Sequence, residues 1–285
     1  MKSAILRSAM ALAFGMSLAM SAHAVDTWTY TSTSNGAGVD TASSGAATLT
    51  TTGVYATNAT AGTGCTTTCT TMSNGISGNW STGALTAYPG LGMSTDGSTE
   101  PNHALDNAGL YTEGVLLTFG TSTILTGIDL SYISGDADIS VFRYTGSVAP
   151  GALSSTGASL GAMTTAGWQL VGNYANLTAD ATSPYAYNLI NGATDSDGGS
   201  GVTPKASNSS VGSSWWLITA YNTSYGSGSG LSQGDDYFKL LAVAGTTCGT
   251  GNNAPCGPKK VSEPGSLALA SLALFGVIYS RRRRV

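Results

Sequence analysis

The chain has 285 residues, only 9% of them charged, and a formal net charge of −4 at pH 7. Six of its eleven basic residues lie in the two end segments, so the central part is clearly acidic and has no basic stripe to neutralise phosphates. This distribution argues against nucleic-acid binding. Clusters of Tyr, Ile, Leu, Val and Trp supply material for a hydrophobic core, which argues against a charge-driven disordered chain.

Residues 1–24 have the three parts of a secretory signal peptide. Lys2 and Arg7 form a short positive segment, an apolar run follows at 9–20, and Ala22-His23-Ala24 supplies small residues at the cleavage site. We therefore expect export by the Sec machinery and cleavage by signal peptidase, with Val25 as the mature N-terminus. The alternative is an uncleaved N-terminal anchor, for which the apolar run is short.

Residues 25–99 are rich in Thr, Ser, Gly and Ala, with isolated aromatic residues. Alternating stretches such as Thr27–Thr31 suit half-buried strands, because Thr is β-branched and favours extended backbone. We expect β-structure with long loops here, forming one domain with the region that follows.

Residues 100–245 carry the stronger strand signals. Runs of apolar and β-branched residues are separated by turns rich in Gly, Asn and Asp, and no segment has a helical period. The expected strands are 114–119, 124–133, 139–144, 167–172, 185–189, 214–221 and 237–243. This pattern predicts an all-β fold, built as an antiparallel sandwich or jelly roll.

The C-terminal part begins with a Gly/Pro/Asn-rich linker at 246–260. Val261, Ser262, Glu263 and Pro264 then precede an apolar stretch, which is followed by Arg281, Arg282, Arg283 and Arg284. Roughly sixteen apolar residues give about 24 Å of helix, a little less than the ~30 Å hydrocarbon core of a bilayer. The arginines would stay cytoplasmic and act as a stop. We expect a transmembrane helix in 261–285; the alternatives are a permanent anchor and a C-terminal core helix, and the arginines argue against the second.

A Glu-Pro pair, a short apolar helix and terminal arginines in this order resemble the PEP-CTERM sorting signal, with Ser262 where the first proline usually stands. The resemblance implies transient anchoring in the inner membrane, removal of the tail by an exosortase, and a cell-surface or extracellular destination. Four segments of the body, 134–146, 167–174, 215–216 and 234–243, resemble exosortase-dependent surface proteins. That second resemblance implies a β-rich surface protein and adds little about its chemistry.

The four cysteines, Cys65, Cys69, Cys248 and Cys256, suit an exported protein in which disulfides can form. Three pairings are possible, and the short spacings favour the local bridges Cys65–Cys69 and Cys248–Cys256. Zinc binding is the alternative, but no histidine lies near either pair and the spacings are unusual for zinc.

A reaction centre has few candidates in this sequence. His103 is the one histidine left after signal removal, and no nucleophile motif accompanies it. Glycosidase chemistry would need two facing carboxylates, and the sequence cannot place the candidates face to face. Those candidates are Glu100, Glu113, Asp129, Asp136 and Asp138.

Calcium is a possible cofactor, and no other cofactor is expected. Asp136, Asp138, Asp235 and Asp236 can offer oxygen ligands, whereas the loop at 195–199 lacks the later acids of an EF-hand.

An aromatic sugar platform is a further possibility, formed by Trp215, Trp216, Tyr221 and Tyr225. Because neighbouring residues on a strand point to opposite faces, at most one of Trp215 and Trp216 can belong to the core while the other faces outward.

The leading hypothesis is a non-enzymatic exported surface or extracellular-matrix protein, sorted by an exosortase and associated with exopolysaccharide or biofilm. A carbohydrate-binding module on the cell surface is the second reading, and a secreted polysaccharide hydrolase is the third. The expected partners are the exosortase, signal peptidase, the Sec machinery, the membrane before processing, and exopolysaccharide.

Overall fold

The computed structural model describes residues 26–30, 39–44, 47–58, 75–87, 90–93, 103–179, 188–189 and 211–248. All of them belong to the compact unit 24–257. The predicted signal peptide and the predicted sorting segment with its transmembrane helix lie outside the described residues. So do Cys65, Cys69, Cys256, Glu100 and most of the expected strand at 185–189. None of the helices in the described ranges is long and apolar enough to span a membrane.

The described residues are mostly β-structure, with one short α-helix and two 3-10 turns. The strands are β1 (Asp26–Thr29), β2 (Val39–Ser44), β3 (Ala47–Asn58), β4 (Ile76–Gly83), β5 (Leu85–Ala87), β6 (Leu91–Met93), β7 (Leu105–Asp106), β8 (Tyr111–Ile133), β9 (Ile139–Tyr144), β10 (Trp168–Tyr174), β11 (Asn188–Leu189), β12 (Ser213–Ala220) and β13 (Tyr237–Thr247). The helical elements are η2 (Leu153–Ser155), α2 (Leu160–Thr165) and η4 (Thr223–Tyr225).

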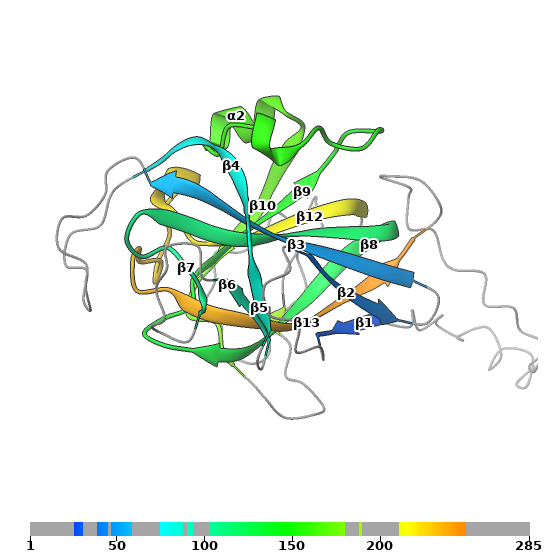
Figure 1. Cartoon of the computed structure of the whole chain (residues 1–285), viewed down its shortest axis with the longest axis horizontal. Coiled ribbons are helices and arrows are strands. Elements are labelled where there is room, and N and C mark those ends of the chain that lie inside the picture. The colour runs from blue at the N-terminus through cyan, green and yellow to red at the C-terminus, as the bar shows by residue number, and fades with distance from the viewer. Residues whose placement is uncertain are drawn as a thin grey trace, which may run out of the picture. The chain divides into compact units, whose positions relative to one another are not determined.

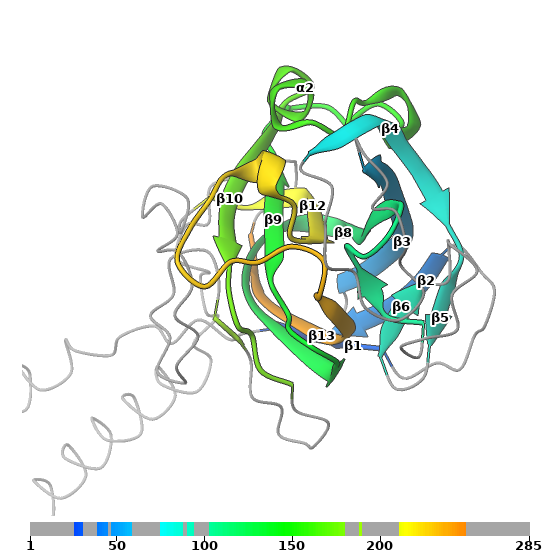
Figure 2. The ribbon, with the colours of Figure 1, turned by 90° about the vertical axis from the view of Figure 1, so that its left-hand side faces the viewer.

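One antiparallel sheet contains all thirteen of these strands, with β10-β9-β12-β8-β13-β6-β5 as its main path (Figures 1 and 2). The 23-residue strand β8 connects its two parts, because its first half pairs with β3 and β12 and its second half with β13. The prediction of a mostly β, antiparallel fold is confirmed. The predicted sandwich of two separate sheets is not confirmed, because β8 takes part in both halves of the described sheet and makes it continuous.

The bend in β8 lies where the sequence suggested a turn. Gly120, Thr121 and Ser122 were expected to separate two strands, but they stay within one extended strand. The pairing with β12 is irregular at this point, where its register passes from Thr123 to Thr118. A glycine inside a strand often marks such a bend. Hydrogen bonding to neighbouring strands on both sides of the bend therefore replaces the predicted turn.

The sheet is buried on both faces. Along β12, Trp216 and Ile218 point into an inner core, and Leu217 points into an outer core on the opposite face, as the two-residue period of a strand requires. The inner core also receives large side chains from β1, β3, β8 and β13. The outer core consists of Val54, Ala56, Ile76, Trp80, Phe142, Tyr144, Leu153, Ala158, Met163, Trp168, Leu217 and Tyr225.

The helix α2 contributes to the outer core and was not predicted from the sequence. It begins after Ser159, whose side chain accepts a hydrogen bond from the backbone N–H of Ala162, a typical N-cap. Met163 points inward, and its Sδ accepts a hydrogen bond of 3.2 Å from Trp80 Nε1 on β4. The six-residue length of α2 explains why no helical period was visible in the sequence.

The first and last strands of the described body are neighbours. Asp26 of β1 lies opposite Gly245 of β13, and Thr247 Oγ1 donates a 2.8 Å hydrogen bond to Asp26 Oδ2. Trp28 is fully buried in the inner core, edge-on to Phe119 at 4.9 Å between ring centroids. The β1–β13 pair therefore joins the beginning of the body to its end.

The chain leaves β13 at Cys248. Its backbone N–H donates a 2.7 Å hydrogen bond to the carbonyl of Ser122, and its sulfur is disulfide-bonded. Because the other three cysteines lie outside the described residues, the predicted pairing stays a prediction.

Candidate functional site

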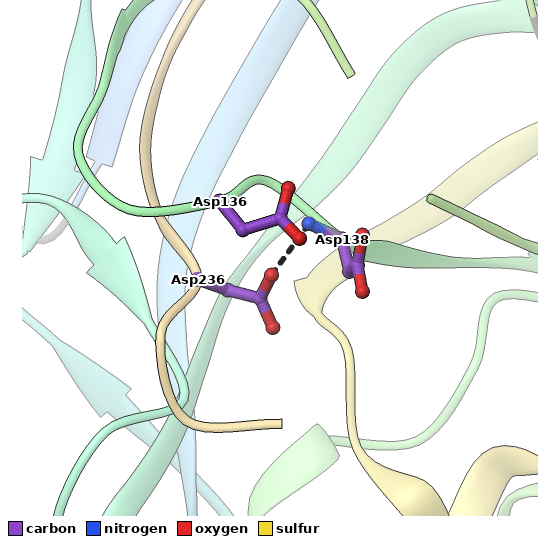
Figure 3. Close-up of side chains that lie close together, drawn as sticks. All are labelled: Asp136, Asp138 and Asp236. Atoms are coloured by element: carbon purple, nitrogen blue, oxygen red, sulfur yellow. Dashed lines mark hydrogen bonds between the residues drawn. The ribbon is translucent and has the colours of Figure 1, made fainter. Parts of the chain in front are cut away.

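Two neighbouring aspartates and a third that is about a hundred residues away in the chain meet at one end of the sheet (Figure 3). Asp136 and Asp138 lie in the turn between β8 and β9, and Asp236 directly precedes β13. One carboxylate oxygen from each lies within 4.8 Å of the others. We call these three residues the acidic cluster. Backbone hydrogen bonds from Asp136 N to Asp235 O (2.9 Å) and from Tyr237 N to Asp136 O (3.1 Å) hold the two segments together.

The carboxylates of the cluster accept hydrogen bonds from backbone N–H groups of several loops. Asp138 accepts one from Asn176, which follows β10, at 2.8 Å, and one from Ser232, in the loop before β13, at 2.6 Å. Asp236 Oδ1 accepts one from the N–H of Asp138 at 2.6 Å (Figure 3). Asp136 Oδ1 accepts one from Ala137 at 2.7 Å. The cluster thus fixes three loops relative to one another.

Asn107 completes this arrangement. Its Nδ2 donates to Asp236 Oδ2 and, at 2.7 Å, to the carbonyl of Tyr221. Its Oδ1 accepts a 2.9 Å hydrogen bond from the N–H of Gly234. Asn107 is fully buried. Sequence reasoning missed it, because a single asparagine after a two-residue strand carries no recognisable pattern.

Burial and like charge both act against ionisation of the cluster. Asp138 and Asp236 have 0% relative exposure. Burial raises the pKa of Asp138 to about 6, opposed by the hydrogen bonds from Ser232 and Asn176 and reinforced by the nearby charge of Asp136. Burial and the charge of Asp138 raise the pKa of Asp236 well above its ordinary value. The mutual repulsion can be relieved by a proton or by a cation bound between the carboxylates.

The donor set of the cluster suits a hard cation such as Ca²⁺, which prefers oxygen ligands and accepts irregular geometry. Of the four aspartates proposed from the sequence, the structure brings together Asp136, Asp138 and Asp236. Asp235 instead accepts a 2.9 Å hydrogen bond from Ser232 Oγ. Hydrolysis of a sugar bond needs two carboxylates that flank the bond, whereas the carboxylates of Asp138 and Asp236 are fully buried.

The other residues considered for catalysis lie apart from one another. His103 lies just before β7 in a left-handed backbone conformation, with φ of 54°. Glu113 is buried in the half of β8 that pairs with β12, and Asp129 in the half that pairs with β13. The described residues therefore do not assemble His103, Glu113 and Asp129 into one site.

The predicted sugar platform needs a correction. Trp216 is fully buried, and its Nε1 donates to the carbonyls of Thr123 (3.0 Å) and Ser213 (3.1 Å). Tyr221 and Tyr225 are also buried, so three of the four rings have no surface to offer a sugar. Trp215 alone is partly exposed, edge-on to Tyr144 at 5.8 Å. Trp215 and Trp216 face opposite sides of β12, as strand geometry predicts, but Trp215 packs against the outer core and does not face solvent alone.

The C-terminal segment of the chain shows which class of protein this β-rich body belongs to. Residues 260–284 match the PEP-CTERM protein-sorting motif, which marks an exosortase-sorted protein. Proteins with this motif are exported and become associated with the membrane or surface through the exosortase. The chain is therefore an exosortase-sorted exported protein, as the sequence predicted. No curated protein and no solved structure matches it significantly.

Proposed function

We propose that this protein is a non-enzymatic component of the cell surface or extracellular matrix, associated with exopolysaccharide or biofilm. The observation that carries the proposal is the sorting motif at 260–284, which directs the body to the envelope. A body delivered there would be in a position to contact polysaccharide outside the cell. This makes a matrix component the simplest function for the sorted body.

The buried polar groups support a structural role for the body. Each carboxylate of the acidic cluster accepts a backbone N–H, and Asp236 is held by Asn107 as well. Such bonds position loops and leave the groups poorly placed to attack a substrate. They therefore favour a folded display module over a hydrolase.

The sorting step is tested by mass spectrometry of the mature C-terminus in strains with and without the exosortase. We expect the peptide carrying Arg281 to Arg284 only in the strain without the enzyme. Its presence in both strains would contradict processing of the tail and leave a simple membrane anchor.

The matrix role needs a separate measurement. We expect the mature body to co-purify with washed exopolysaccharide and deletion of its gene to weaken the biofilm, with no polysaccharide turnover by the purified body. A body found only in the culture medium, with an unchanged biofilm, would count against this role. Turnover of a polysaccharide panel that one carboxylate substitution abolishes would favour the hydrolase.

Direct carbohydrate binding is a second candidate function, favoured by the partly exposed ring of Trp215. A tryptophan ring offers an apolar face for a sugar beside its polar edge. We expect Trp215→Ala to weaken retention on the cell's own polysaccharide at least tenfold with the fold intact. Val148→Ala is the matched control, because Val148 is 72% exposed and lies in the loop after β9, away from strand β12. Equal retention of both variants would exclude Trp215 as the contact.

A further inference from the structure

The outer core occupies only one end of its face of the sheet. This face runs over β3, β8 and β12, which lie side by side (Figure 1). Along β3, every second side chain points to it, and exposure rises from one end of the strand to the other. Val54 is buried in the outer core, Thr52 and Thr50 are half-buried, and Thr48 is exposed. The face therefore changes along β3 from a packed core to an accessible surface.

β8 and β12 show the same gradient in the same direction. Leu217 is fully buried and Trp215 is partly exposed on β12, while Leu116 and Thr118 are half-buried on β8. The strand register places Trp215 opposite Thr118 and Thr118 opposite Thr50. We call these three residues the cross-strand row. Because neighbouring strands are about 4.8 Å apart, the row spans roughly 10 Å at right angles to the strands.

The hydroxyl groups of the cross-strand row are not used to hold the fold together. Among the described residues, the side chains of Thr50 and Thr118 form no hydrogen bond. Thr51, which points to the other face of β3, is instead buried and bonded to the hydroxyl of Tyr30. The two half-buried hydroxyls of the row thus keep their donors and acceptors for water or a ligand.

The surface around the row carries no charge. β3 and β12 contain no charged residue, and the single one in residues 111–120 of β8, Glu113, lies on the inner side together with Val115. An anionic polymer would find no cation here to pair with. An apolar protein partner would find threonines where the centre of an interface is usually hydrophobic. An aromatic ring beside free hydroxyls suits an uncharged sugar chain better than either.

We infer that the cross-strand row binds an extended, uncharged polysaccharide chain that lies across β12, β8 and β3. A sugar ring packs against Trp215, and sugar hydroxyls exchange hydrogen bonds with Thr118 and Thr50. Successive units of an extended polysaccharide are spaced about as far apart as the strands, so each strand meets one unit. The inference rests on the carbohydrate-binding function proposed above. It adds the charge of the ligand, its direction on the sheet and two threonines that determine specificity.

The test measures retention of the exported protein, as purified from the cells, on immobilised polysaccharides. Hydroxyethyl cellulose and galactomannan are the uncharged probes, and alginate is the anionic one. Thr50→Val and Thr118→Val, singly and together, remove the hydroxyls but keep β-branched side chains of similar shape. Thr57→Val is the matched control, because Thr57 is exposed on the same strand as Thr50 but points to the opposite face. Trp215→Ala is measured alongside, and urea unfolding confirms that each variant is folded.

We expect an uncharged probe to retain wild type and alginate to retain it at least tenfold less. Each single variant should weaken retention about twofold to tenfold, the usual effect of one neutral hydrogen bond, and the double variant at least tenfold. Thr57→Val should stay within twofold of wild type. Raising the salt from about 0.05 M to about 0.5 M should also change retention less than twofold, because no charge pair is screened.

Three results would overturn the inference. The first is equal or stronger retention on alginate. The second is retention that Trp215→Ala weakens but the double threonine variant does not, which would leave the carbohydrate-binding function standing without the row. The third is no retention on either uncharged probe, together with a wild-type dimer that Thr118→Arg dissociates, which would assign the face to a second copy of the chain. Retention unchanged in Trp215→Ala as well as in the double variant would overturn both the row and the proposed contact of Trp215.

Discussion

The outer core and the acidic cluster stabilise their surroundings by opposite means. The outer core packs aromatic rings under α2 and β4, with Tyr144 and Trp168 at 5.3 Å and Phe142 and Tyr225 at 4.9 Å. The acidic cluster instead ties loops together through carboxylates, of which those of Asp138 and Asp236 are fully buried. Apolar packing depends little on pH or on ions, whereas buried carboxylates depend on both. Only the second region can therefore respond to the environment outside the cell.

The largest expected effect comes from the outer core. Trp168→Ala should lower the free energy of unfolding by about 3–5 kcal/mol, because Trp168 is 1% exposed and its removal leaves a cavity between β10 and Tyr144. Urea unfolding measures the loss, which should be the same at pH 5 and pH 7. A clearly smaller loss of unfolding free energy at one of these pH values would contradict the claim that the outer core is insensitive to pH.

The acidic cluster should show the opposite behaviour in buffer with a chelator. The pKa of Asp138 is about 6 in the folded state against an ordinary value of 3.8, so the fold favours the protonated form. Its stabilising contribution is fully present below pH 3.8 and is lost as the pH rises through about 6, and Asp236 shifts in the same direction. Relative to Asp138→Asn, wild type should lose on the order of 1–3 kcal/mol between pH 4 and pH 7.

The comparison with Asp138→Asn concerns the slope of stability against pH. Asparagine loses one acceptor for the N–H of Ser232, so its absolute stability also changes, but it cannot titrate. If the curves of unfolding free energy against pH are parallel for wild type and Asp138→Asn between pH 4 and pH 7, burial of Asp138 does not control the pH response.

Calcium should restore the stability that the acidic cluster loses at neutral pH. Extracellular calcium modules bind with Kd near 10⁻⁴ to 10⁻³ M, so about 10 mM calcium would stabilise a folded site by about 1.4–2.7 kcal/mol. We expect a rise in melting temperature that Asp136→Asn abolishes and Asp235→Asn retains, since only Asp136 belongs to the acidic cluster. An unchanged melting temperature in excess calcium would mean that the carboxylates relieve their repulsion with a proton.

The smallest effect again belongs to the outer core. Met163→Leu keeps most of the buried volume but removes the Sδ that accepts the hydrogen bond from Trp80 Nε1. The expected loss is about 1 kcal/mol, seen as a melting temperature lowered by a few degrees. Val148→Leu, on the exposed 146–152 loop, should change nothing measurable. A loss above about 3 kcal/mol would show that this weak bond matters more than the packing around it.

Local parts of the fold were predictable because each rests on a short pattern. The alternation in 139–144, bounded by a Gly-Asp turn, gave the bounds that β9 has in the structure. The opposite facing of Trp215 and Trp216 follows from strand geometry alone. The 23-residue extent of β8 was not predictable, because its Gly-Thr-Ser segment has the composition of a turn and is kept extended by distant strands.

The candidate site was predictable only as a set of residue types. The sequence indicates that the Asp-x-Asp pair at 136–138 and the Asp pair at 235–236 can bind a cation. It gives no reason why Asp138 should contact Asp236, which is 98 residues away. That contact arises because the last residues of β8 and the first residues of β9 and β13 lie at the same end of the sheet. The contribution of Asn107 depends on the same convergence.

The length of β8 also affects how the body resists local unfolding and proteolysis. Because β3, β11, β12 and β13 all pair with this strand, none of these four strands can leave the sheet without disturbing it. Unfolding should therefore be a single cooperative event, and the amides of β8 should exchange with solvent only when the whole body opens. An exported protein that met proteases would gain from this arrangement, since local fluctuations would rarely expose its central backbone to cleavage.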